Sequence, residues 1–335
     1  MIKVGIIGYG YWGPNLVRNF VNNKKCQLVC ICDLDKKKLK KASKLYPNIL
    51  ATNNYKDIIN NNKIDAVVIA TPVDTHFKLA LSALKSKKHV LVEKPITSSS
   101  SQAKILIEEA ERQGLTLMVD HTFIYTGAVR KINELVNMKN FGDIKYYDST
   151  RINLGLFQHD VNVLWDLAVH DLSIMSYIIK KKPIAVSANG HSRVSDEPEY
   201  AAFLSVYFDD IIAHINVNWL SPVKIRKTLV CGSKKMIVYD DLESIEKVKV
   251  YNKGIKVEKS EKEIYKTLIS YRTGNMWSPK LSEIEALTIE IDHFINCILK
   301  KKKPLSSAED GLEIVKILEL ANKSLRQKGK PQYLL

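Results

Sequence analysis

The first third of the chain alternates short apolar runs with stretches of helical spacing. The apolar runs predict strands over residues 2–8, 27–32, 64–70, 89–93 and 116–120. Between them, apolar positions recur every three to four residues and predict helices over residues 14–23, 35–46, 75–87 and 98–113. The serine run at 98–101 supplies caps, so it predicts a helix start rather than a flexible linker. Single helices between successive strands imply a parallel, doubly wound sheet.

The second half follows a different period. After a turn at Phe141-Gly142-Asp143, apolar and polar residues alternate along most of the chain. Period-two alternation predicts a large, mostly antiparallel open sheet, with strands over residues 143–153, 184–192, 201–208, 211–219, 226–231, 234–239 and 246–251. One helix, from Asp166 to Lys180, interrupts this pattern, and two more helices, near 282–299 and 307–327, end it.

The first turn reads Gly8-x-Gly10-x-x-Gly13, directly after a predicted strand and at the start of a helix. Gly8 permits the tight turn, Gly10 lets a pyrophosphate approach the backbone, and Gly13 lets the helix pack on the strand. The N–H groups of the helix N-terminus then face the phosphates. We expect Tyr11 and Trp12, inside the turn, to contact the same ligand. The fold class is therefore α/β. A Rossmann dinucleotide-binding domain is expected over residues 1–123. A substrate-binding and oligomerisation α+β domain is expected over 124–335, with the C-terminal helices free to pack back on the first domain.

Asp33 ends the second predicted strand, where a carboxylate binds the hydroxyls of the adenine ribose. A carboxylate at this point repels a 2′-phosphate, so NAD is favoured over NADP. The lysines at 36–38 reduce this preference slightly, since they could neutralise such a phosphate.

Two further segments follow strands at the same edge of the sheet, where ligands of open parallel sheets bind. Thr71, Pro72 and His76 follow the third long strand and are expected to line the cofactor cleft, although His76 fits a position near a helix cap equally well. Glu93-Lys94-Pro95 follows the next strand. A lysine there points at the nicotinamide region or, as strand-end lysines usually do, into solvent.

On the helix of the second half, Asp166 and His170 lie four residues apart and so share a face. A carboxylate one turn away can orient an imidazole and raise its basicity. A histidine satisfied on a half-buried helix is the simpler interpretation of the same spacing. Asp171 is expected to cap the helix or to face solvent.

Composition narrows the class of protein. The chain has 335 residues and a net charge of +15, which suits an anionic substrate or reflects solvated lysine-rich faces. Nucleic acid is disfavoured, because no basic arm or nucleic-acid motif occurs. The five cysteines form no CxxC pair and are expected to be buried free thiols. No metal is expected, since there is no HExxH and no Cys/His cluster. No apolar run approaches the ~20 residues that cross a bilayer, and the N-terminus lacks a signal pattern, so we expect a cytoplasmic protein without membrane contact.

Together, the glycine motif, Asp33, ATPVDTH, EKP and the Asp166-x-x-x-His170 helix resemble the Gfo/Idh/MocA family of NAD(P)-dependent oxidoreductases, over nearly the whole chain. The resemblance implies that Lys94, Asp166 and His170 converge on the nicotinamide, with Glu93 at the cofactor and a cis Lys94–Pro95 bond. Many members carry a second Asp three residues after the histidine, where this chain has Ser173.

Within the family, the segment from Arg151 to Asp171 resembles the branch that acts on nucleotide sugars. This implies oxidation at C3 of a UDP-N-acetylglucosamine-type sugar, for polysaccharide or lipid-sugar biosynthesis. The residues expected to contact the substrate are Arg151, Asn153 and Asn162, with Tyr125 behind them; Trp165 stacks on uracil or, more simply, packs.

Two other functions stay open. One is oxidation of a free sugar or polyol such as inositol with the same residues, and the other is a non-catalytic nucleotide-sensing module. The open sheet and the resemblance both favour a homodimer or homotetramer. Residues 253–280 are interpreted either as a loop over the active site or as an oligomer contact.

Overall fold

The computed structural model describes residues 1–155, 161–192, 198–252, 254–257 and 269–334. The chain forms two compact units. The first comprises residues 1–126 and 284–319, and the second comprises residues 127–283 and 320–335. The segment that contains the helix α8 (Ala286–Lys300) belongs to the first unit.

A parallel six-stranded sheet forms the centre of the first unit, in the order β3-β2-β1-β4-β5-β6. The strands are β1 (Ile2–Ile7), β2 (Cys26–Cys32), β3 (Leu50–Thr52), β4 (Ala66–Ile69), β5 (His89–Glu93) and β6 (Leu117–Asp120). The helices between them are α1 (Gly13–Asn22), α2 (Lys36–Leu45), α3 (Lys56–Ile59), α4 (Val73–Lys85) and α5 (Ser100–Gln113). The predicted Rossmann sheet is confirmed. The short elements β3 and α3, and a 3₁₀ helix at Thr122–Tyr125, were not predicted.

Burial explains why these segments form their elements. Every side chain of β4 is buried, as expected for a central strand of a parallel sheet. On α1, Leu16, Val17 and Phe20 are completely buried and lie on one face. The predicted serine cap is confirmed, because Ser99 Oγ accepts a hydrogen bond from the Gln102 N–H at the start of α5. The strand order reverses direction between β1 and β4, and ligands of such sheets bind at the carboxyl ends of the strands on either side of that point.

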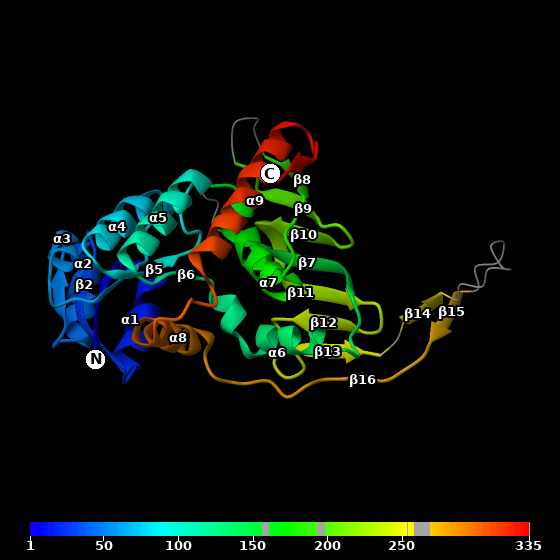
Figure 1. Ribbon diagram of the computed structural model, residues 1–335, viewed down its shortest axis with the longest axis horizontal. Helices are drawn as coiled ribbons and strands as arrows, with labels where there is room; N and C mark the ends of the chain where they lie inside the picture. The colour runs from blue at the N-terminus through cyan, green and yellow to red at the C-terminus, as the bar shows by residue number, and fades with distance from the viewer. Residues whose placement is uncertain (156–160, 193–197, 253, 258–268, 335) are drawn as a thin grey trace. The chain divides into compact units, whose positions relative to one another are not determined.

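The second unit contains a nine-stranded sheet in the order β16-β13-β12-β11-β7-β10-β9-β8-β17 (Figure 1). Its strands are β7 (Ile144–Leu154), β8 (Ala185–His191), β9 (Ala201–Tyr207), β10 (Ile212–Asn218), β11 (Leu220–Gly232), β12 (Met236–Asp240), β13 (Val248–Tyr251), β16 (Met276–Trp277) and β17 (Gln332–Tyr333). The pair β10–β7 is parallel and the other pairs are antiparallel, so the predicted, mostly antiparallel sheet is confirmed.

Helices and a small hairpin complete this unit. The helices are α6 (Gly127–Val136), α7 (Val169–Ile179) and the last turns of α9 (Ala308–Arg326). A π-helical segment, Leu164–Ala168, leads directly into α7. The strands β14 (Gly254–Val257) and β15 (Ile269–Arg272) pair with each other, and the rest of the 253–268 stretch lies outside the described residues. No helix in the described part of the chain is long and apolar enough to cross a membrane.

Candidate active site

The glycine turn between β1 and α1 has the geometry of a phosphate cradle. Gly8 has φ +104°, which side chains rarely adopt, and a Cβ on it would lie 2.2 Å from the Ala70 carbonyl oxygen. A Cβ on Gly13 would lie 2.5 Å from the Gly8 carbonyl oxygen, so Gly13 lets α1 start close to the turn. A Cβ on Gly10 would meet nothing within 4 Å. The open side of the turn is thus at Gly10, where the sequence predicts the pyrophosphate.

The other predicted cofactor contacts near this turn, Asp33, Tyr11 and Trp12, differ in their surroundings. Asp33 Oδ2 accepts a hydrogen bond from the Tyr9 N–H at 2.7 Å, and its Oδ1 accepts one from the Asp35 N–H at 2.8 Å. The carboxylate that ends β2 is therefore fixed against the glycine turn. Tyr11 is almost fully exposed, whereas Trp12 donates its Nε1–H to Asp120 at 3.2 Å. Trp12 thus connects the turn to the end of β6, a contact that the sequence pattern did not indicate.

The segment after β4 is held to the EKP segment by His76. This ring is buried, with Nε2 lying 2.8 Å from the Thr71 carbonyl oxygen and Nδ1 lying 2.9 Å from the Pro95 carbonyl oxygen. Burial lowers the pKa of His76, although both carbonyl contacts act in the opposite direction. Pro72 precedes α4 directly. With both nitrogens facing main-chain oxygens, His76 joins the turns after β4 and β5 to each other.

Glu93 ends β5, at the same sheet edge as the glycine turn, and Lys94 follows it. The Lys94–Pro95 peptide bond is cis, as the family resemblance implied. Glu93 Oε2 accepts a hydrogen bond from the Lys94 N–H at 3.2 Å. Burial and the neighbouring Asp120 raise the pKa of Glu93 well above its usual range. A neutral or shared-proton carboxyl therefore lies directly before the candidate catalytic lysine.

In the second unit, Asp166 lies in the π-helical segment and the half-buried His170 lies in the first turn of α7. Asp166 Oδ2 accepts a hydrogen bond from Trp219 Nε1 at 3.0 Å. Trp219 is fully buried just after β10, and sequence reasoning missed it because no motif links it to the helix. π-Segments are frequent at functional sites and change the angular spacing that four residues span in an ordinary α-helix.

Arg151, a predicted substrate contact, is buried on β7 and forms an ion pair with Asp171, with Nε 2.6 Å from Oδ2. Asp171 is itself buried, so the expectation that it caps the helix or faces solvent was wrong. The physical reason is the face of β7 on which Arg151 lies. Arg151 lies on the covered face of β7 with Tyr147, whose hydroxyl donates to the Asp171 carbonyl oxygen, so the strand presents the guanidinium to α7.

The remaining predicted substrate residues differ in what they contact. Asn162 is buried and donates its Nδ2 hydrogens to Glu199 and Asn322, each at 2.9 Å, which is a structural set of contacts. Trp165 is buried, in agreement with packing. Tyr125 is buried in the first unit, where its hydroxyl lies 3.0 Å from Ser306 Oγ. Asn153 is half-buried near the end of β7, two residues after Arg151 and therefore on the same side of the strand.

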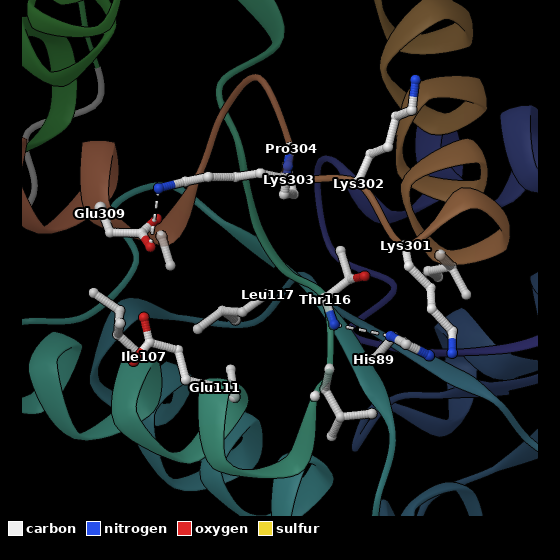
Figure 2. Close-up of a pocket in the computed structure, with 15 residues that line it drawn as sticks. His89, Ile107, Glu111, Thr116, Leu117, Lys301, Lys302, Lys303, Pro304 and Glu309 are labelled. Carbon is white, nitrogen blue, oxygen red and sulfur yellow. Dashed lines mark hydrogen bonds and ion pairs between the residues drawn. The ribbon is translucent and has the colours of Figure 1, made fainter.

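A cavity of about 530 Å³ lies at the amino ends of strands of the parallel sheet, opposite the ends that the glycine turn follows (Figure 2). Its lining includes His89 and Leu117, which begin β5 and β6, together with Lys301, Lys303 and Glu309. The glycine turn follows the carboxyl end of β1, so this cavity is not the cofactor cleft. Its charges are of both signs, and Lys303 pairs with Glu309 at 3.1 Å.

The fold and the glycine turn define an NAD-binding oxidoreductase. Two family models match the chain: an oxidoreductase family, NAD-binding Rossmann fold, over residues 2–121, and an oxidoreductase family, C-terminal alpha/beta domain, over residues 133–332. The chain therefore belongs to the Gfo/Idh/MocA family, and its cofactor is NAD.

Three curated relatives show the range within the family. The chain is 34% identical to the uncharacterized oxidoreductase YdgJ of Escherichia coli over 44% of this chain and 42% of the relative. It is 25% identical to a UDP-N-acetylglucosamine 3-dehydrogenase of Acidithiobacillus ferrooxidans, over 70% and 71%. It is 23% identical to a myo-inositol 2-dehydrogenase of Thermotoga maritima, over 98% and 97%.

The matched segments cover only 42%, 56% and 60% of the first three curated relatives. Among solved structures, that of the A. ferrooxidans enzyme matches with a TM-score of 0.82 at 20% identity, over 97% of this chain and 98% of that one. At this identity the likeness supports the fold.

Proposed function

We propose that this protein is an NAD-dependent dehydrogenase that removes a hydride from a sugar hydroxyl carbon, most favourably C3 of a UDP-N-acetylglucosamine-type nucleotide sugar. The observation that carries the proposal is the position of Lys94. It follows β5 directly, at the sheet edge where the glycine turn opens at Gly10. An ammonium group at that edge lies on the side of the sheet where a cofactor and its substrate bind.

Three side chains are assigned roles. NAD supplies the hydride acceptor when it is bound. Lys94 stabilises the negative charge that develops on the substrate oxygen, and His170 accepts the hydroxyl proton. Asp166 orients His170, and Trp219 fixes Asp166 through its Nε1–H. Lys94 and His170 can exchange the roles of stabiliser and base, and the pH dependence of turnover in single variants distinguishes the two arrangements.

Two observations favour a nucleotide-sugar substrate. The net charge of +15 favours a diphosphate-bearing substrate, and one relative is a UDP-N-acetylglucosamine 3-dehydrogenase. The Arg151–Asp171 pair favours the second candidate, a free polyol, because a guanidinium neutralised by a buried carboxylate is a poor phosphate ligand. A relative that the chain matches over nearly its whole length is a myo-inositol 2-dehydrogenase.

A reduction assay separates these substrates. The protein, at a concentration comparable with that of NAD, is mixed with UDP-N-acetylglucosamine, its 6-carboxylate form or myo-inositol, and the near-ultraviolet absorbance of reduced nicotinamide is followed. Reduction with a UDP-sugar alone supports the first substrate class. Reduction with inositol alone rejects it and keeps the assigned residues.

The Lys94→Met variant tests the catalytic assignment. We expect turnover to fall by at least about a hundredfold, because one charge that stabilises the developing alkoxide is lost. NAD affinity, measured by quenching of tryptophan fluorescence, should stay within about threefold. Near-normal turnover in this variant would refute the role of Lys94.

A further inference from the structure

A cluster of carboxyl groups lies buried in the first unit, at the end of β5 and β6. Glu93 and Asp120 end these two strands and are register partners, and Glu290 reaches them from α8. Asp120 and Glu290 are both buried side chains, with Glu290 completely so. Three carboxylates of like charge this close in an apolar setting cannot all be ionised.

Asp120 is the acceptor at the centre of the cluster. Its Oδ2 accepts the Trp12 Nε1–H at 3.2 Å and its Oδ1 accepts the Thr122 hydroxyl at 2.5 Å. A carboxylate offers about four acceptor positions, so two positions remain. Glu93 and Glu290 both contact Asp120.

The two glutamates lack the donors that an ionised carboxylate requires. Within the described part of the chain, no N–H or O–H group donates to either Glu290 oxygen or to Glu93 Oε1. Thr122 also lies beside Glu290, but its one hydroxyl hydrogen is donated to Asp120. Two carboxyl groups in contact form a hydrogen bond only if one of them carries a proton.

The pKa shifts of the groups in and around the cluster agree with protonated Glu93 and Glu290. Burial first, and then Asp120, raises the pKa of Glu290 and that of Glu93 well above the usual range. His121 is completely buried and burial lowers its pKa to about 4, so it is neutral and offers no compensating charge. Tyr125 faces Glu290 with a pKa that burial raises well above its usual value. The charge of Lys94, beside Glu93, acts in the opposite direction on the pKa of Glu93.

We propose that Glu290 is a positioning residue of the cofactor site: it is protonated at neutral pH and donates its carboxyl O–H to Asp120, as Glu93 does. Asp120 then accepts hydrogen bonds from four donors: Trp12, Thr122, Glu93 and Glu290. Through Trp12 it fixes the glycine turn, and through Glu93 it fixes the main chain before Lys94. Two parts of the sequence that bind NAD are thereby held by one residue from a distant helix.

Three variants of the full chain test this. Glu290→Gln keeps the shape and an N–H donor for Asp120 but cannot ionise. Glu290→Leu removes the donor and leaves Asp120 with a vacant acceptor position. Glu134→Gln makes the same chemical change on an exposed face of α6 and serves as the control.

We expect the Glu290→Gln and Glu134→Gln variants to bind NAD within about twofold of the wild type, and the Glu290→Leu variant about tenfold more weakly, which corresponds to one charge-assisted hydrogen bond. The infrared band of protonated carboxyl groups at about pH 8 should be smaller in Glu290→Gln than in the wild type and unchanged in Glu134→Gln. Equal NAD affinities in the Gln and Leu variants, an unchanged infrared band, or a Glu290→Gln chain that does not fold would each overturn the proposal.

The pH dependence has a definite sign. A carboxyl group whose pKa is raised on folding binds more protons in the folded state than in the unfolded state. Wild-type stability should therefore fall, relative to Glu290→Gln, as the pH rises from about 5 to about 9. A melting-temperature difference that does not change over this range would contradict the assignment. The role of Glu290 in fixing the main chain before Lys94 rests on the proposed function. NAD affinity, the infrared band and the melting temperature are measured without turnover. The Glu290 proposal and the proposed function can therefore fail separately.

Discussion

At the scale of single residues, Gly10 and Gly13 of the first turn differ in what surrounds them. Gly13 is required by the chain itself, because a Cβ there would lie 2.5 Å from the Gly8 carbonyl oxygen. Gly10 has no neighbour within 4 Å of the equivalent position, so no contact in the described part of the chain requires a glycine there. The close approach at Gly13 agrees with the packing role that the sequence motif assigned to this glycine.

This difference predicts that two alanine variants change the melting temperature differently, although both should weaken NAD binding. Gly13→Ala should lower the melting temperature by several degrees and weaken NAD binding, because the turn must open. Gly10→Ala should leave the melting temperature within about one degree and weaken NAD binding by about tenfold or more, because the methyl group occupies the approach of the pyrophosphate. Calorimetry and fluorescence titration measure both. A stable Gly13→Ala variant with unchanged NAD affinity would show that the turn is not under this constraint.

At the scale of elements, the π-helical segment before α7 positions Asp166. Its carboxylate is held by Trp219, from just after β10. Gly155, at the end of β7, packs on the same indole, where a Cβ would lie 2.4 Å from Trp219 Cδ1. The i to i+4 spacing of Asp166 and His170 predicted a shared helical face. The structure shows that Trp219 holds the Asp166 carboxylate from the sheet side.

We expect Trp219→Phe to lower turnover by about tenfold or more, because Asp166 loses one charge-assisted hydrogen bond. NAD affinity should change by less than about twofold. Trp165→Phe is the matched control. Its indole is also buried, but its Nε1 has no hydrogen-bond partner among the described residues, so this variant loses packing alone. Equal losses of turnover in the two variants would assign the effect of Trp219 to packing.

At the scale of the whole molecule, one face of the nine-stranded sheet carries large apolar side chains among polar ones. On β9 and β10 the buried positions alternate with Phe203, Tyr207, Ile212 and His214 on the opposite face. Phe203 and Ile212 are about half exposed, and the Phe203 ring stacks on His214 with centroids 6.2 Å apart. An exposed apolar sheet face of this kind marks an association surface. We propose that it joins copies of this chain into a homodimer or homotetramer.

Light scattering coupled to gel filtration tests this. The wild type should have two or four times the chain mass of 38.1 kDa. Phe203→Glu should shift the population towards monomer, because a carboxylate would be buried in an apolar contact. Ile245→Glu places the same charge at a highly exposed residue outside the named strands and should leave the mass unchanged. A monomeric wild type, or an unchanged mass in Phe203→Glu, would reject this surface.

Local spacing along the chain was enough to predict the order and type of nearly all long elements. Period-two and helical spacing depend on which side of an element faces a core, and that is written locally along the chain. The sequence also determined the glycine turn, because Gly8 and Gly13 occupy positions at which a side chain collides with the main chain of the same turn or the next strand. All five cysteines are free thiols, but only four of them are buried as expected, because Cys231 is half-buried.

Tertiary structure decided what each polar side chain contacts. Arg151 is paired with Asp171, and Glu290 lies against Asp120, although these partners are far apart in the sequence. The reason is physical: local periodicity specifies the face on which a residue lies, but its partner and its proton depend on which segments the fold brings to that face, and on how much water they exclude.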